Sequence, residues 1–326
     1  MLNARVVGTG SYVPAQVVTN ADLERQVQTS DRWIVERTGI RERHLAAPDE
    51  ATSDLAVKAG RAALSSAGVA PDAVDLIIVA TATPDMPFPS TACLVQAHLK
   101  ATSAAAMDLS AACSGFLFAL SVAEQYICSR TYRRVLVIGA EVMSRLVNWE
   151  DRNTCILFGD GAGAVLLAPS RTRRGILCSR LCTDGALWNL ICVPGGGSAM
   201  PPSAHVLEKK LHTITMKGNE TFKSAVRYLG EVAQQALETA HMTPKDVTWV
   251  IPHQANMRIL HAVAERLSID IDKMIINLDR YGNTSAASIP LAWDEAVRDG
   301  RIQPGDILLL LAFGSGLTWA ASIVRW

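Results

Sequence analysis

The sequence has no net charge and no long apolar segment. Lys and Arg together number 31 among 326 residues, and so do Asp and Glu. A chain without excess positive charge has no global field to attract nucleic acid or an anionic membrane, so an anionic ligand must be held by a local cluster. No run of about 18 apolar residues is present that could span a membrane, and the first five residues lead into a strand pattern rather than a signal peptide. We expect a cytoplasmic protein that binds neither nucleic acid nor a membrane.

The seven cysteines lack the spacing of a metal site. None belongs to a Cys-x-x-Cys pair, and the closest two, Cys178 and Cys182, have no matching His/Cys pair elsewhere. In a reducing compartment most unpaired thiols are simply small hydrophobic side chains. We therefore expect no metal.

Length and composition indicate a compact globular protein with more than one core. Apolar residues make up 49% of the sequence and charged residues 19%, which is typical of a compact protein with a large core. A length of 326 residues exceeds the size at which single cores usually stop growing. Two domains or subdomains are expected.

The chain contains a diverged internal duplication. Three segments of the first half have counterparts in the same order in the second half: residues 71–80 and 244–253, 110–113 and 285–288, and 135–139 and 307–311. The repeated strands are unbroken apolar runs between helical patterns, which predicts largely parallel sheets buried on both faces. We divide the chain into an N-terminal half, residues 1–172, and a C-terminal half, residues 173–326. Equivalent loops of two such halves can converge on one site.

Cys113 follows a run of small residues and precedes an apolar helical pattern that starts at Phe116. A thiol at a helix N-terminus meets the positive end of the helix dipole, which favours the nucleophilic thiolate. Such a cysteine can carry an acyl group covalently. A buried structural cysteine is the alternative, and this segment alone leaves both open.

Three peptides of the second half add polar groups. His253 stands where an apolar strand ends, a usual place for active-site residues in α/β sheets, although a structural histidine is the commoner case. Asn283 lies in a Gly/Asn turn before small residues, which by itself reads as a helix cap. Gly314, Ser315 and Gly316 follow a buried strand and offer backbone N–H groups, although alone they form only a turn.

Together these peptides resemble the β-ketoacyl-acyl carrier protein synthase III family of the thiolase superfamily. The most specific are His-Gln-Ala-Asn at 253–256 and Gly-Asn-Thr-Ser-Ala-Ala-Ser at 282–288. The resemblance covers essentially the whole chain and includes residues 8–14, 29–43 and 158–163. It implies an α/β, thiolase-like fold in which two similar halves form a five-layered αβαβα sandwich. A homodimer is also implied.

The resemblance implies a Cys-His-Asn triad at Cys113, His253 and Asn283. An acyl group would pass from coenzyme A to Cys113, its oxyanion held by N–H groups of Cys113 and the 314–316 loop. Malonyl-acyl carrier protein would then lose CO2, and its enolate would attack the acyl-cysteine. His253 and Asn283 would hold the thioester oxygen as uncharged donors. Coenzyme A thioesters are substrates here, and no cofactor is expected.

The family also implies binding residues. Acyl carrier protein, the second partner, would meet positive charge at Lys223 and Arg258. The residues that match family binding positions are Trp33, Arg37, Arg152, Gly218 and Asn219 for coenzyme A, Lys223, Gln254, Ala255, Asn256, Met257 and Arg258 for the carrier protein, and Phe88 and Phe313 for the acyl pocket. Phe88 would come from the partner subunit, and its bulk favours a short primer such as acetyl-CoA.

Two departures and several alternatives stand beside this interpretation. Glu265 replaces a basic residue of some members, although Arg266 follows, and Ser315 replaces a common glycine.

An acyltransferase of secondary metabolism with another acceptor is the second enzyme hypothesis. A degradative thiolase needs a second catalytic cysteine near the C-terminus, and none follows Cys192. A non-catalytic carrier-binding subunit would lack the nucleophile, and a papain-like protease needs a different fold.

Overall fold

A computed structural model of the chain describes residues 2–172 and 174–326. The expected boundary between the halves, 172/173, touches Arg173, which lies outside the described residues together with Met1. The exact boundary therefore stays a prediction.

Two β-sheets form the frame of the molecule. The first has the strand order β1-β7-β6-β4-β5, and the second has the order β11-β12-β13-β8. Their bounds are β1 Asn3–Tyr12, β4 Leu76–Ala80, β5 Ala105–Leu109, β6 Val135–Val142, β7 Asp160–Ser170, β8 Gly175–Thr183, β11 Trp249–Pro252, β12 Ile307–Gly314 and β13 Thr318–Arg325.

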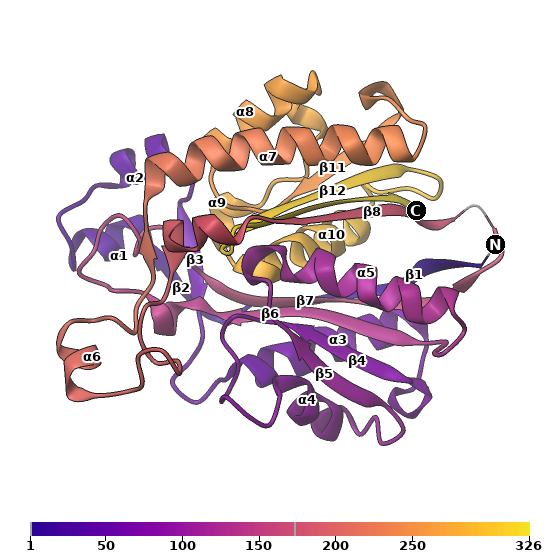
Figure 1. Cartoon of the computed structure of the whole chain (residues 1–326), viewed down its shortest axis with the longest axis horizontal. Helices are drawn as coiled ribbons and strands as arrows, with labels where there is room; N and C mark the ends of the chain where they lie inside the picture. Colours follow the sequence, from indigo (N-terminus) through magenta and orange to yellow (C-terminus); the bar gives the residue numbers. More distant parts are fainter. Residues whose placement is uncertain (1, 173) are drawn as a thin grey trace.

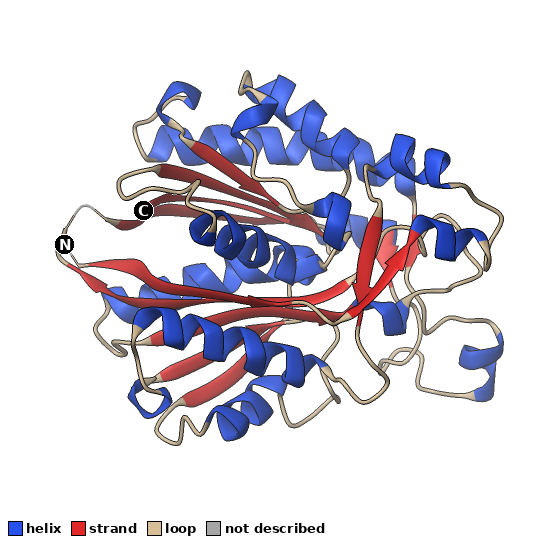
Figure 2. Cartoon of the chain, turned by 180° about the vertical axis from the view of Figure 1, so that it is seen from behind, coloured by secondary structure: helices blue, strands red, loops and turns tan. Residues whose placement is uncertain are grey.

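Helices fill the space between the sheets and cover their outer faces. Helices α5 (Gly115–Cys128) and α10 (Ser288–Arg298) lie between the two sheets, and α7 (Gly218–Thr239) with α8 (Met257–Leu267) covers the second sheet (Figures 1 and 2). Helix α3 (Thr52–Ala67) packs with α4 (Thr91–Leu99) on the far face of the first sheet. The expected five-layered αβαβα sandwich of an α/β, thiolase-like fold is confirmed.

Short elements surround this frame. They are β2 Gln16–Thr19 paired with β3 Glu42–Leu45, β9 Ile191–Cys192 paired with β10 Thr215–Met216, and the helices α1 Asn20–Glu24, α2 Asp31–Thr38, α6 Ala204–Glu208 and α9 Leu278–Tyr281. Seven 3₁₀ turns, η1 to η7, join the described elements. None of the described helices has the length and apolar character needed to cross a bilayer.

The sheets are mixed, so the expectation of largely parallel sheets is wrong. Strand β4 is parallel to β5 and β6, and β11 is parallel to β12. The pairings β1–β7, β6–β7, β12–β13 and β13–β8 are antiparallel. Burial between helical layers, rather than parallel pairing, makes these strands apolar throughout: every residue of β4, β6 and β12 is buried.

The internal duplication is visible in the strands and in two 3₁₀ turns. Strands β4 and β6 correspond to β11 and β12, and η2 (Ala112–Ser114) before α5 corresponds to η7 (Ser285–Ala287) before α10. Both turns open on a left-handed residue, Ala112 with φ 45° and Ser285 with φ 49°. This pairs Cys113 with Ala286, whereas the sequence comparison had paired it with Ser288, two residues further on.

Gly139 of β6 lets the second turn approach the first sheet. A Cβ atom built at Gly139 would lie 2.3 Å from the backbone oxygen of Ala286, closer than any real contact. Only glycine therefore allows η7 to rest on β6. The two turns pack against each other at the centre of the molecule.

Candidate active site

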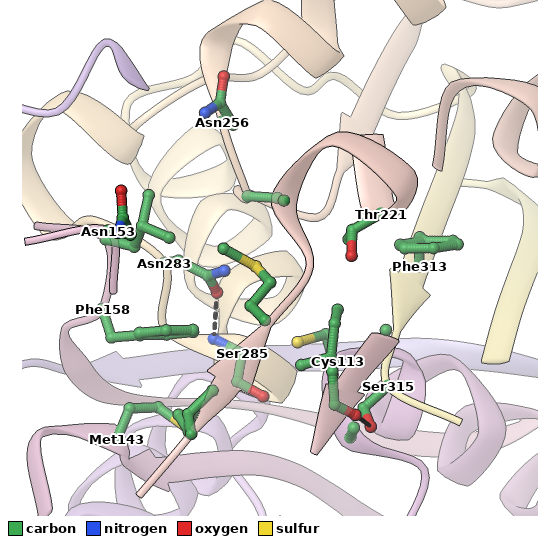
Figure 3. A pocket seen from close by; sticks show the side chains of 18 of the residues that line it. Cys113, Met143, Asn153, Phe158, Thr221, Asn256, Asn283, Ser285, Phe313 and Ser315 are labelled. Carbon is green, nitrogen blue, oxygen red and sulfur yellow. Dashed lines mark hydrogen bonds between the residues drawn. The ribbon is translucent and has the colours of Figure 1, made fainter. Parts of the chain in front are cut away.

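A cavity of about 770 Å³ opens between the two halves and reaches Cys113. Cys113, His253 and Asn283, which the sequence places far apart, all line it. Gly314, Ser315 and Phe313 line it too, whereas Gly316 is not among its lining residues. Figure 3 shows Cys113 between the Asn283 and Phe313 sides of this cavity.

Cys113 sits in the middle of η2, two residues before α5 begins. The helix was expected to start at the cysteine, and it starts two residues later. The Ser114 hydroxyl donates to the Thr318 carbonyl at 3.0 Å, and the Thr318 hydroxyl donates to the Ala111 carbonyl at 3.1 Å. These bonds tie the nucleophile's turn to β13 of the other half.

Burial favours the protonated form of the Cys113 thiol. Burial raises its pKa to about 12, and the negative charge of Glu141 acts in the same direction, while the Ser285 hydroxyl opposes both because it can hydrogen-bond the thiolate. Desolvation thus acts against the thiolate that the helix terminus was expected to favour, and the balance between the two effects stays a prediction. A proton must leave the sulfur when it attacks.

His253 is neutral at physiological pH. It follows β11 directly, its backbone N–H donates to the Leu311 carbonyl at 2.7 Å, and its side chain is only 5% exposed. Burial lowers its pKa to about 4. Its Nδ1 atom is buried with no hydrogen-bond partner among the described residues.

The Asn283 amide is oriented by its own turn. Its Oδ1 atom accepts a hydrogen bond from the backbone N–H of Ser285 at 2.9 Å, drawn in Figure 3. The backbone on either side is fixed by bonds between Asn283 N and the Leu157 carbonyl, 2.8 Å, and between Gly159 N and the Asn283 carbonyl, 3.1 Å. With the oxygen engaged, the amide group has its Nδ2 donor left for a ligand.

Gly314 brings the 314–316 loop against the nucleophile. A Cβ atom at Gly314 would lie 2.7 Å from the backbone nitrogen of Cys113, so a larger residue would push the two segments apart. Ser315, which replaces a common glycine, donates its hydroxyl to the Ile191 carbonyl. The extra side chain thus links the loop to β9, which also lines the cavity through Ile191 and Cys192.

Most of the residues expected at coenzyme A line the cavity. Trp33, Arg37, Gly218 and Asn219 line it. Arg152 is not a lining residue, but its guanidinium lies 4.9 Å from the centre of the Trp33 ring, and that of Arg37 lies 4.8 Å from it. Trp33 therefore already makes two cation–π contacts.

The residues expected at the carrier protein divide into two groups. Arg258 is exposed, lines the cavity and covers the Phe222 ring at 5.4 Å, while Ala255 and Asn256 line the cavity beside it. Lys223 is exposed outside the cavity, and Met257 is half-buried against Gly39.

The expectation that Gln254 binds the carrier protein is wrong. It is 1% exposed, its Nε2 donates to the carbonyls of Pro252 and Ile275, and its Oε1 accepts from the Asn277 N–H. A side chain so buried and satisfied holds the 253–256 turn and cannot meet a carrier protein.

Phe88 does not belong to this chain's cavity. Its side chain is 85% exposed and it is not among the lining residues, unlike Phe313. Its expected place in a partner's pocket stays a prediction.

Sequence reasoning missed one ionisable residue behind the site. Glu141 is fully buried in β6, and its carboxylate accepts a hydrogen bond from the Ser285 hydroxyl at 2.9 Å. Burial raises its pKa, and the hydrogen bonds it accepts oppose that rise. A single acidic residue inside an otherwise apolar strand was the signal that could have revealed it.

Comparison with known proteins identifies the family. A family model described as 3-oxoacyl-[acyl-carrier-protein (ACP)] synthase III matches residues 107–185, and one described as its C-terminal part matches residues 237–326. A curated relative from Caldanaerobacter subterraneus subsp. tengcongensis, named beta-ketoacyl-[acyl-carrier-protein] synthase III, is 54% identical over 99% of this chain and 98% of its own length. The chain belongs to the β-ketoacyl-acyl carrier protein synthase III family. It is a condensing acyltransferase of the kind that initiates fatty acid biosynthesis.

Solved structures agree with this assignment. The synthase III of Aquifex aeolicus is 48% identical and has a TM-score of 0.93, with 99% of this chain and 100% of that chain covered. The priming β-ketosynthase of a polyketide pathway is 35% identical, with a TM-score of 0.91 and coverage of 99% and 96%. Among the described residues no group of three His, Cys, Asp or Glu side chains is arranged to hold a metal ion.

The buried neutral His253 should make stability depend on pH. Because burial lowers its pKa from 6.5 to about 4, the unfolded chain binds the proton more readily between these values, and folding stability falls as pH drops through this window. The contribution is on the order of 3 kcal/mol. Urea unfolding at pH 7 and pH 4.5 should give a smaller difference in unfolding free energy for His253→Gln than for the wild type.

A matched control is His261→Gln, which replaces an exposed histidine on α8. It should keep the wild-type difference between the two pH values. Equal differences in the wild type and His253→Gln would show that the histidine is not held neutral by burial.

Proposed function

We propose that this synthase joins an acyl group from coenzyme A, most simply acetyl, to malonyl-acyl carrier protein in two half-reactions through an acyl-Cys113 thioester. The observation that carries the proposal is the single cavity in which Cys113, His253 and Asn283 meet, with Trp33 and Arg37 at its outer part. A thioester tail that enters past Trp33 reaches the sulfur through this cavity.

In the first half-reaction Cys113 attacks the carbonyl carbon of acyl-CoA. The oxyanion forms beside the backbone N–H of Cys113 and the 314–316 loop, which Gly314 brings into contact with the nucleophile's backbone. Preorganised N–H donors of this kind typically lower such a barrier by about 3 kcal/mol. The thiolate of coenzyme A leaves and is protonated by solvent.

In the second half-reaction His253 and Asn283 hold the thioester oxygen of the malonyl group. Loss of CO2 places negative charge on that oxygen, and the enolate carbon then attacks acyl-Cys113. The low pKa of His253 supports this role, because a neutral imidazole and an amide donate hydrogen bonds without attracting the malonyl carboxylate into the wrong position. The product is a 3-oxoacyl-acyl carrier protein.

Adenine recognition would use the exposed face of Trp33. Arg152 now covers that ring at 4.9 Å, so a base that stacks on Trp33 would displace the guanidinium and then lie between the two. Arg152 is exposed, and the hydrogen bond that its guanidinium donates to the Gln28 carbonyl at 3.3 Å would have to rearrange in this change. Arg37, Gly218 and Asn219 would meet the phosphates and pantetheine.

An acyltransferase of secondary metabolism is the second candidate, and the polyketide priming enzyme among the solved relatives is its support. The curated fatty acid relatives are more similar, at 50% to 54% identity, so initiation of fatty acid synthesis is favoured.

We also propose residues 1–172 and 173–326 as the two halves. A cytoplasmic location suits a nucleophilic thiol that must stay reduced.

A homodimer would complete the acyl pocket. Strand β5 is an edge of the first sheet and pairs only with β4 among the described strands. In the loop between β4 and α4, Met86 and Phe88 expose large apolar side chains. Unpaired edges and exposed apolar side chains are the usual ingredients of an interface. We propose that two copies meet here and that Phe88 enters the partner's acyl pocket.

Acetyl-CoA should leave an acetyl group on Cys113. Intact mass spectrometry after incubation should show one added acetyl unit, and Cys113→Ala should abolish it, because the thioester needs this sulfur. The six remaining cysteines serve as the internal control. Acetylation that persists in Cys113→Ala would exclude Cys113 as the acyl carrier, and a panel of longer acyl-CoA thioesters would reveal the preferred primer.

Carrier-protein recognition should depend on Arg258. Arg258→Glu should raise the KM for malonyl-acyl carrier protein about tenfold at low salt and flatten its salt dependence, because rim charges mainly govern encounter with an acidic partner. Acetylation of Cys113 should remain close to wild type. Arg227→Glu, an exposed arginine on α7 outside the cavity, is the matched control, and equal effects of both changes would argue against docking at Arg258.

The dimer should be lost when Phe88 becomes charged. Sedimentation of the wild type should give twice the chain mass of 35.0 kDa, and Phe88→Asp should shift the protein toward the monomer because it buries a charge at the interface. Leu181→Asp on β8 changes another partly exposed leucine and should not alter the mass. A monomeric wild type would refute the proposed interface.

A further inference from the structure

Glu141 is an ionisable group that the proposed two half-reactions do not use. It is fully buried, and five donors surround its carboxylate. Its Oε2 accepts from the Thr83 hydroxyl at 2.7 Å, the Ala82 N–H at 3.0 Å and the Thr81 hydroxyl at 3.2 Å. Its Oε1 accepts from the Ser285 hydroxyl at 2.9 Å, and the Ala286 N–H lies 3.4 Å from it.

The surrounding hydroxyls are arranged to donate. The Thr81 hydroxyl oxygen accepts the Thr83 N–H at 3.0 Å, and the Thr83 hydroxyl oxygen accepts the Val142 N–H at 2.9 Å. With their oxygens engaged, the protons of both hydroxyls point to Glu141. This shell supports a carboxylate, while burial raises the pKa of Glu141 and so favours the protonated acid.

Ser285 bonds Glu141 through its hydroxyl and stands on η7, the turn that packs against η2 with Cys113. Its backbone N–H is fixed by Asn283 Oδ1, its turn packs against the turn of Cys113, and both side chains line the cavity, as Figure 3 shows. The Ser285 hydroxyl favours the Cys113 thiolate, and the charge of Glu141 disfavours it. Both Ser285 and Glu141 therefore influence the protonation of Cys113.

The other carboxylate and the imidazole that line the cavity, those of Asp151 and His253, are less suited to take the proton of the thiol. The Asp151 carboxylate already accepts hydrogen bonds from Asn153 and Thr154. His253 is a poor proton acceptor because burial lowers its pKa to about 4. Asp160 on β7 pairs with Val142, the residue after Glu141. Because successive side chains of a strand point to opposite faces, Asp160 faces the other side of the sheet from Glu141. The segments that donate to Glu141 are residues 81–83 and η7, and neither contains another titratable group. Turn η7 packs against η2, which carries the Cys113 thiol.

We propose that Glu141 stores the Cys113 proton during catalysis, with the Ser285 hydroxyl as the link. As the sulfur attacks acyl-CoA, its proton passes to the Ser285 oxygen while the Ser285 proton passes to the Glu141 carboxylate. The S–C bond forms, the C–S bond to coenzyme A breaks, and the departing thiolate takes a proton from solvent. This inference rests on the proposed function.

The second half-reaction returns the proton. When the enolate attacks acyl-Cys113, the C–S bond breaks and the Cys113 thiolate is regenerated. Glu141 then gives its proton to Ser285, and Ser285 gives its own to the sulfur. The overall reaction consumes one solvent proton, which ends on coenzyme A, and Glu141 is a carboxylate again. Glu141 is thus a positioning residue that acts through Ser285.

The decisive measurement is the pH dependence of Cys113 acylation. Rapid-quench mixing with acetyl-CoA, read by intact mass between pH 6 and pH 10, should show Glu141→Gln about a hundredfold or more slower than wild type at pH 7, the usual scale for losing a general base. Its rate should rise about tenfold per pH unit, because only the thiolate formed by solvent reacts. The deficit should therefore shrink at high pH.

Two further variants separate a proton path from a structural role. Ser285→Ala keeps the backbone, since alanine already adopts the same left-handed conformation at position 112, but it removes the link and should share the steep pH dependence. Thr81→Val removes another hydroxyl from the same carboxylate without lying between it and Cys113, so it should keep the shape of the wild-type pH profile.

Alkylation of Cys113 by iodoacetamide, followed on its peptide by mass spectrometry, is the readout that does not need an acyl-CoA substrate. Glu141→Gln should again show the steeper pH dependence. If the wild type is not acetylated but this difference appears, the proposed function fails and the proton store stands. Equal loss at every pH in Glu141→Gln, a wild-type profile in Ser285→Ala, or a steep profile in Thr81→Val would each overturn the inference.

Discussion

The close contact between the 3₁₀ turns η2 and η7 is the constraint on which the site depends. Each turn begins with a residue held at positive φ, Ala112 or Ser285, and each leads into a helix of the central layer. Gly139 and Gly314 allow backbone to approach backbone where any side chain would collide. Because the two turns come from equivalent places in the two halves, the duplication itself brings a nucleophile from one half to an amide donor from the other.

Burial then determines the charge of each group at that contact. Removal from water leaves Cys113 as a thiol and His253 as a neutral imidazole. Asn283 carries no charge at any pH, and the Ser285 N–H fixes which end of its amide is available. His253 and Asn283 therefore offer hydrogen-bond donors without fixed positive charge, which suits the brief enolate of the proposed second half-reaction.

The sequence permitted the prediction of the features that have local or motif signatures. The five layers, the pairing of halves and the convergence of Cys113, His253 and Asn283 all followed from peptides such as 253–256 and 282–288. Features set by tertiary contact did not follow. Strand direction depends on which strands become neighbours, the pKa of Cys113 depends on desolvation, and the burial of Gln254 depends on Ile275 and Asn277, which are distant in sequence. Glu141 has no motif around it and gains its meaning only from Ser285.

A decarboxylating condensing enzyme faces conflicting electrostatic demands. Acylation benefits from a base near the thiol, yet a carboxylate beside the sulfur would repel the malonyl carboxylate and the enolate that follow. In this fold the carboxylate of Glu141 lies within the sheet, one hydroxyl removed from the sulfur, and five donors around it spread its charge. Ser285 can pass a proton over that distance without bringing the charge into the cavity. In the proposed mechanism, the separation between base and nucleophile is what lets one site carry out both half-reactions.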